Sequence, residues 1–129
     1  MVLLDSSVWV AIDRRRLSLS ELIPRDEEVA CCPIVLTEVM RGTRLERYTV
    51  TRAMLSNATM LDAPTPLRRF EEAALIYLRC RAKGVTPSTP DCLIAACAIA
   101  NGVPLLHDDS DFNQIARFTR LPLFTRSGA

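Results

Sequence analysis

Short apolar runs alternate along this chain with longer stretches in which apolar residues recur at helical spacing. The runs predict five strands, at residues 2–5, 29–32, 59–61, 103–106 and 121–124. The periodic stretches predict helices over residues 6–15, 35–41, 45–55, 67–83, 90–101 and 111–116. Strands that alternate with helices predict a mainly parallel sheet with helices on both faces. We therefore expect a three-layer α/β/α fold with five strands.

The ends of the two longest predicted helices carry clear signals. Gly84 and Gly102 follow the last periodic residues, where glycine is favoured at a helix carboxyl end. Thr89 is the predicted N-cap of the helix over residues 90–101, with Pro90 at its first position. The sequence LIAACAIA within that helix is apolar on every face, which predicts that its amino end lies inside the fold.

The length and hydropathy of the chain favour one compact domain. At 129 residues, without a linker or repeat, a single domain over 1–129 is expected. No apolar run is long enough to cross a bilayer, and no cationic segment precedes the first apolar residues as in a secretory signal. We expect a cytoplasmic protein without a membrane segment.

The cysteines do not form a pattern typical of zinc sites or disulfide frameworks. The chain has five, an odd number: Cys31, Cys32, Cys80, Cys92 and Cys97. Each lies among apolar residues, and the single histidine, His107, has no partner at a zinc-ligand spacing. The cysteines are therefore predicted to be buried core residues.

Arginine dominates the positive charge: of the sixteen cations, only Lys83 is a lysine. A guanidinium group binds phosphates through a planar fork, which is compatible with a nucleic-acid substrate, although a general preference for arginine explains the composition equally well. Arg41, Arg44 and Arg47 form either a phosphate-binding rim or a solvated helix face.

Carboxylates follow or interrupt apolar runs at four places. They are Asp5, Glu38, Asp91 and the cluster Asp108, Asp109, Asp111. A carboxylate at the edge of a buried element is costly unless a cation or hydrogen-bond donors meet it. Asp5 and Asp109 follow strands whose carboxyl ends share one edge of a parallel sheet, and the helices that carry Glu38 and Asp91 can reach that edge. The pattern predicts a shared site for a hard divalent cation, Mg²⁺ or Mn²⁺.

Each acid also has a simpler explanation, which for Glu38 is a place on the exposed surface of its helix. Asp5 suits a helix N-cap, although Ser6 and Ser7 suit that position equally well. Asp91 falls in a first helical turn, where negative charge is favoured. The cluster after residue 107 can face water, and we expect at most two of its three acids to point into the pocket.

Taken in order, the segments DSSVW, TEVMRG, TPDCLIAACAIANG and LLHDDSDFNQIA resemble the PIN-domain family, and specifically the VapC-type toxin ribonucleases of toxin–antitoxin pairs. The resemblance implies a Mg²⁺- or Mn²⁺-dependent endoribonuclease that cleaves single-stranded regions of RNA. It also implies a homodimer that is neutralised by a small VapB-like antitoxin. The residues at the family's acidic positions are Asp5, Glu38, Asp91 and Asp109, with Asp111 as a further metal ligand.

Two other functions are compatible with an acidic parallel-sheet edge. A receiver-like signalling domain would use a late lysine beside its phosphorylated aspartate, but Lys83 follows a helix rather than a strand. A catalytically inert PIN-fold binding module would use its acids as caps and surface charge. For protein contacts, Val8, Trp9 and Phe70 are candidates, although burial in the core explains each of them more simply.

Overall fold

The computed structural model describes residues 1–125, so the last four residues of the predicted 1–129 domain lie outside the described part. The strands are β1 (Val2–Leu4), β2 (Val29–Cys31), β3 (Thr59–Met60) and β4 (Leu105–Leu106). The helices are α1 (Ser6–Asp13), α2 (Leu19–Leu22), α3 (Pro33–Arg41), the 3₁₀ turn η1 (Leu45–Arg47), α4 (Tyr48–Leu55), α5 (Leu67–Arg81), α6 (Thr89–Asn101) and α7 (Ser110–Phe118). This alternation confirms the predicted α/β class.

The strands form one parallel sheet in the order β3-β2-β1-β4. In the centre, β1 pairs Val2 with Val29 of β2 and Leu3 with Leu105 of β4. The chain moves outward from β1 through β2 to β3, and then returns to the other side of β1 for β4. The order therefore reverses between β1 and β4, and ligands of parallel α/β sheets bind at the carboxyl edge at such a point.

The prediction of five strands is wrong for the last one. In the described part of the chain the sheet has four strands, and the predicted strand 121–124 is reduced to an isolated parallel bridge from Leu123 to Leu105. Hydrogen bonds from the Leu105 N–H to the Pro122 carbonyl and from the Phe124 N–H to the Leu105 carbonyl, 2.9 and 2.8 Å long, make this contact. Pro122 has no N–H, so it cannot extend the ladder.

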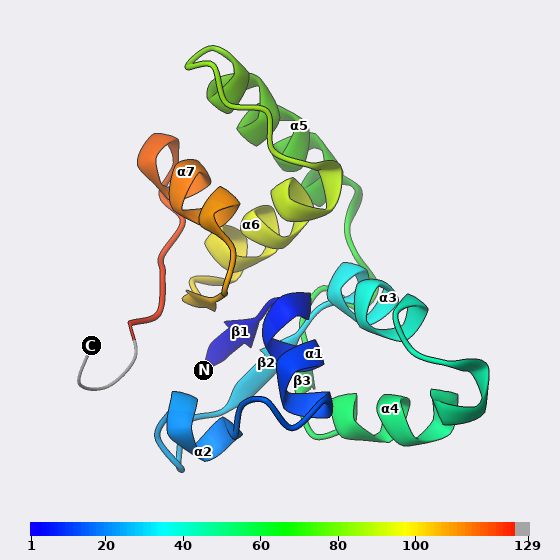
Figure 1. Cartoon of the computed structure of the whole chain (residues 1–129). Coiled ribbons are helices and arrows are strands. Elements are labelled where there is room, and N and C mark those ends of the chain that lie inside the picture. Colours follow the sequence, from blue (N-terminus) through cyan, green and yellow to red (C-terminus); the bar gives the residue numbers. More distant parts are fainter. Residues whose placement is uncertain (126–129) are drawn as a thin grey trace.

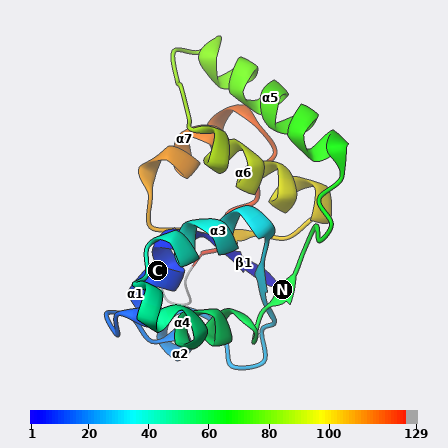
Figure 2. The same ribbon diagram turned by 90° about the vertical axis from the view of Figure 1, so that its right-hand side faces the viewer.

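Helices lie on two sides of the sheet. Figure 1 and Figure 2 both show α5, α6 and α7 together at the top of the molecule and α2 and α4 toward the bottom, while α1 lies at the level of the strands. Helix α3 packs against α1, α4 and α6, so it joins the two groups. The small residues of α6, such as Ala95 and Ala98, are fully buried and allow close packing against its neighbours.

Several helix boundaries differ from the prediction. The N-cap of α6 is Ser88, whose Oγ accepts a hydrogen bond from the Asp91 N–H at 3.2 Å, so Thr89 is the first helical residue and not the cap. The predicted helix 45–55 is divided into η1 and α4, and the four-residue α2 was not predicted. Gly84 and Gly102 have the expected positive φ, and Gly102 is the C-cap of α6.

The core confirms the cysteine prediction, because all five are buried free thiols. Val8 and Trp9 are buried as expected, but the expected burial of Phe70 is wrong, since its relative exposure is 50%. Phe70 lies on α5, whose Leu67, Leu75 and Leu78 are exposed too. In the described part of the chain no helix has both the length and the apolar character that a bilayer crossing requires.

Candidate active site

Asp5 follows β1 directly and is the N-cap of α1. Its Oδ1 accepts hydrogen bonds from the Ser7 hydroxyl at 2.8 Å and from the Val8 N–H at 3.4 Å, so the capping explanation holds for Asp5 rather than for the serines. Its N–H donates to the carbonyl of Leu106 at the end of β4, at 3.1 Å. The residue is only 3% exposed. This burial, with a smaller contribution from the charge of Asp109, raises the pKa of Asp5 to about 6 despite the hydrogen bonds.

Glu38 lies in the middle of α3 and is half-buried, flanked by the buried Val35 and Val39 on its own helix. The Ser6 hydroxyl donates a hydrogen bond to Glu38 Oε1 at 3.3 Å. Ser6 is the first residue of α1, so this bond ties the start of α1 to the middle of α3. The bond holds Glu38 Oε1 beside Ser6, the residue that follows Asp5.

The closest group of acids comes from two helix starts. Asp91 of α6 and Asp109 and Asp111 at the start of α7 each offer an oxygen, and these atoms all lie within 4.8 Å of one another. The pKa of Asp91 is raised to about 6, first by burial and then by the charges of Asp109, Glu38 and Asp111. This repulsion shows that the acids on α3, α6 and α7 share one electrostatic environment.

The turn between β4 and α7 shapes the position of Asp109. Its N–H donates to His107 Nδ1 at 3.0 Å, so this ring nitrogen is the acceptor. The His107 ring packs on the buried Phe112, with ring centroids 5.3 Å apart. Asp109 Oδ1 accepts from the Asp111 N–H at 2.9 Å and caps α7. Asp108 is exposed and contributes no oxygen to the group of three.

The five predicted acids therefore do not all meet in one tight group. Asp91, Asp109 and Asp111 come together, whereas Asp5 and Glu38 lie outside the 4.8 Å group and are linked to it by charge. Asp5, Glu38 and Asp109 each accept hydrogen bonds on one oxygen, and among residues 1–125 no hydrogen bond reaches the other. A hard divalent cation fits this set, because it is ligated by oxygen and relieves the repulsion between carboxylates.

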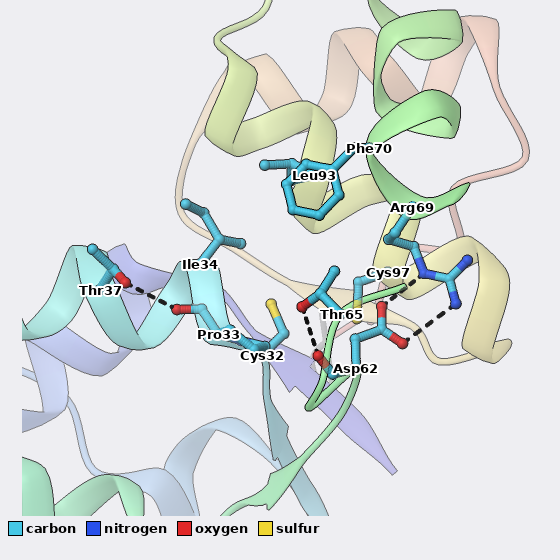
Figure 3. Close-up of a pocket in the computed structure, with 10 residues that line it drawn as sticks. All are labelled: Cys32, Pro33, Ile34, Thr37, Asp62, Thr65, Arg69, Phe70, Leu93 and Cys97. Carbon is cyan, nitrogen blue, oxygen red and sulfur yellow. Dashed lines mark hydrogen bonds and ion pairs between the residues drawn. The ribbon is translucent and has the colours of Figure 1, made fainter. Parts of the chain in front are cut away.

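A separate cavity of about 220 Å³ lies farther along the carboxyl edge, next to β2 and β3. Figure 3 shows Phe70 and Leu93 on one side of it and Cys32 and Asp62 on the other. Asp62 is not available as a ligand, because Arg69 Nε donates to its Oδ2 at 2.7 Å. Burial would raise the pKa of Asp62, but the hydrogen bonds from Arg69 and Asn101 lower it below its ordinary value. This cavity is thus mainly apolar and is distinct from the acidic site.

Sequence reasoning missed the supporting contacts of the site. The N-cap of α6 was predicted one residue too far along, at Thr89 instead of Ser88. The hydrogen bond that His107 accepts from the Asp109 N–H had no sequence signal. Ser6 was considered as a possible N-cap, but its hydroxyl donates to Glu38. The sequence signal for Ser6 was its position after Asp5, a possible N-cap. This signal does not identify Glu38, which lies 32 residues away, as its partner.

Comparison with known proteins identifies the family of the chain. The PIN domain profile matches residues 2–118. The VapC ribonuclease Mb1587 of Mycobacterium bovis and ribonuclease VapC11 of Mycobacterium tuberculosis are each 35% identical to this chain, over 94% of its length and 96% of theirs. The chain therefore belongs to the PIN-domain family, and within it to the VapC group.

Solved structures agree on the fold. The structure of VapBC2 from Rickettsia felis, bound to a DNA fragment from the promoter, matches with a TM-score of 0.78 and 21% identity, over 96% of this chain and 98% of that one. VapBC-5 from Mycobacterium tuberculosis matches with a TM-score of 0.67 and 20% identity, over 95% of each chain. These matches confirm the predicted PIN-like fold.

Proposed function

We propose that this protein is a divalent-metal-dependent endoribonuclease, the toxin of a toxin–antitoxin pair, that cleaves single-stranded regions of RNA. The observation that carries the proposal is the group of three carboxylates at the edge where β1 and β4 end. The 35% identity to two proteins named as VapC ribonucleases supports RNA as the substrate. Because such an enzyme acts on cellular RNA, we place it in the cytoplasm.

In this proposal Asp91, Asp109 and Asp111 hold a Mg²⁺ or Mn²⁺ ion, with Asp5 as a fourth ligand. The ion would supply an activated water and offset negative charge on the phosphate. Asp5 presents its Oδ2, since Oδ1 is held by Ser7 and Val8.

The remaining residues orient the reacting groups. Glu38 lies outside the group of three, and its Oε1 is fixed by Ser6, so we assign it to accept a proton from the attacking water. Asp91 is the alternative acceptor, through a carboxylate oxygen that does not ligate the metal. His107 fixes the backbone of Asp109 and so positions this ligand.

The test is cleavage of a single-stranded RNA pool by the purified protein, with Mg²⁺, with Mn²⁺ and with chelator. We expect cleavage to stop with chelator and in the Asp91→Asn variant. The matched control is Asp108→Asn, an exposed neighbouring acid that should retain activity. Circular dichroism verifies that each variant is folded. Cleavage by the chelated protein or by folded Asp91→Asn would contradict the proposal, and an inert binding module would cleave under no condition.

The proposal includes two protein partners, a cognate VapB-like antitoxin and a second copy of the chain. Several structural relatives are toxin–antitoxin complexes, which supports the antitoxin. For the homodimer we propose the face of α5, where Leu67 is 76% exposed and Phe70 is 50% exposed. Light scattering of the purified protein should give a dimer, and Leu67→Ser with Phe70→Ser should give a monomer. A dimer in the double variant would refute this assignment of the interface.

A further inference from the structure

Four arginines surround a cavity of about 570 Å³ away from the acidic site. Arg14 and Arg15 follow the end of α1, and Arg44 and Arg47 lie in the segment after α3. Among the described residues Asp13 is the one acid that lines the cavity, so the net charge of Asp13 and the four arginines is +3. We call this cavity the arginine pocket. All four arginines are exposed, so their guanidinium groups are accessible to a ligand.

The position of the arginine pocket is fixed relative to the acids by α1. At the first turn of α1, Ser6 hydrogen-bonds to Glu38, and at its last turn Asp13 forms an ion pair with Arg47 at 3.6 Å. The helix rises about 1.5 Å per residue, so the pocket lies roughly 12 Å from Ser6 along the axis. Helices α1 and α3 pack against each other, and their carboxyl ends lead into the segments that carry the arginines.

The backbone around the arginine pocket is held in a defined shape. The Thr43 hydroxyl is hydrogen-bonded to Thr51 at 3.0 Å, and Thr51 is only 1% exposed on α4. On the other side Arg15 has a positive φ of 58°, and its N–H donates to the Ile12 carbonyl at 3.0 Å. Hydrogen bonds therefore hold the segments on both sides of the pocket in place, and its arginines come from two separate segments.

The charge of the pocket exceeds what the helices themselves require. The carboxyl ends of α1 and α3 meet here, and two such ends carry roughly one negative charge together. A surplus of positive charge remains, at the opposite end of α1 from a site whose carboxylates repel a polyanion. A substrate with phosphates on both sides of the scissile bond needs cations at a distance from those carboxylates.

We infer that the arginine pocket binds backbone phosphates of the RNA substrate at a distance from the scissile bond. This inference rests on the proposed function and adds a second binding site to it. Arg44 and Arg47 belong to the rim predicted from the sequence, whereas Arg14 and Arg15 come from the turn after α1. Phosphate contacts carry little sequence information, so the pocket would hold the RNA in register without selecting its bases.

The test compares the pocket variant, Arg14→Ala/Arg44→Ala, with a control variant, Arg25→Ala/Arg120→Ala. The two control arginines are also exposed, but they lie outside the pocket, before β2 and before the Leu123 bridge. Binding of a single-stranded RNA oligonucleotide is measured by fluorescence anisotropy over a salt series, in the Asp91→Asn background to prevent cleavage. Loss of two phosphate contacts should lower the slope of log K against log salt by about 1.4 and weaken binding roughly tenfold at about 0.1 M salt. The control should retain more of the affinity and slope than the pocket variant.

In the cleavage-competent protein the pocket variant should raise KM, with single-turnover cleavage at saturating RNA unchanged. An unaltered salt slope in the pocket variant, with wild-type cleavage intact, would overturn the inference and leave the proposed function standing. A wild-type protein that neither binds nor cleaves RNA would overturn both. An acidic protein segment is the alternative occupant. Tighter binding of a polyglutamate peptide than of RNA of equal charge, abolished in the pocket variant, would also overturn the inference.

Discussion

Replacement of Asp5 by asparagine should stabilise the metal-free protein while it removes a proposed ligand. Burial raises the pKa of Asp5 from its ordinary 3.8 to about 6, which corresponds to about 3 kcal/mol against the ionised carboxylate in the folded chain. Asparagine removes the charge and retains an Oδ1 acceptor for Ser7 and Val8, and it is an equally good N-cap. Because the buried amide has a cost of its own, we expect a gain of about 1–2 kcal/mol in the free energy of unfolding at pH 7.5.

The pH dependence follows from the direction of the shift. Between pH 3.8 and about 6 the folded wild-type protein binds more protons at Asp5 than the unfolded chain does. The contribution of Asp5 to the free energy of unfolding therefore falls as the pH rises through this range. The Asn variant lacks this contribution, so its advantage at pH 7.5 should shrink toward zero at pH 4.

The assay is urea unfolding in chelator at both pH values, repeated with Mg²⁺ at pH 7.5. Mg²⁺ should stabilise the wild-type protein more than the variant, because a ligand that binds only the folded state adds to its stability. The matched control is Asp26→Asn, an exposed acid whose replacement should change stability by less than about 0.5 kcal/mol. If Asp5→Asn is less stable than the wild type at pH 7.5 in chelator, the reasoning from burial is refuted.

Three further variants test the supporting contacts. Arg69→Met leaves a buried carboxylate without its cation and should lower the free energy of unfolding by about 3 kcal/mol, whereas Arg68→Met at an exposed position should change it by less than about 0.5. His107→Ala removes the acceptor of the Asp109 N–H and should weaken Mn²⁺ binding about tenfold by calorimetry; unchanged affinity would exclude a positioning role. Ser88→Ala removes the cap of α6 and should cost about 1 kcal/mol in urea unfolding, and no loss would contradict the capping geometry.

The order of strands and helices was predictable because each element has its own periodicity in the sequence. The acids were recognisable for a similar reason, since charges at the ends of apolar runs are costly without a partner. The predicted last strand failed because Pro122 limits pairing, which depends on the neighbouring strand as well as on local hydrophobicity. The contact between Ser6 and Glu38 was not predictable, because it requires the packing of α1 on α3. Likewise, sequence alone did not separate Asp91, Asp109 and Asp111 from the other two acids.

The pairing of β1 with β4 determines when the site is assembled during synthesis. Leu3 pairs with Leu105, and the Asp5 N–H bonds to Leu106, so residues about a hundred positions apart must meet before Asp5 lies near Asp109. Contacts of such long range form late, and domains fold as their chain emerges from the ribosome. The acids on α6 and α7 are also among the last to emerge. The active site of this ribonuclease is therefore complete only when almost all of the domain has been translated.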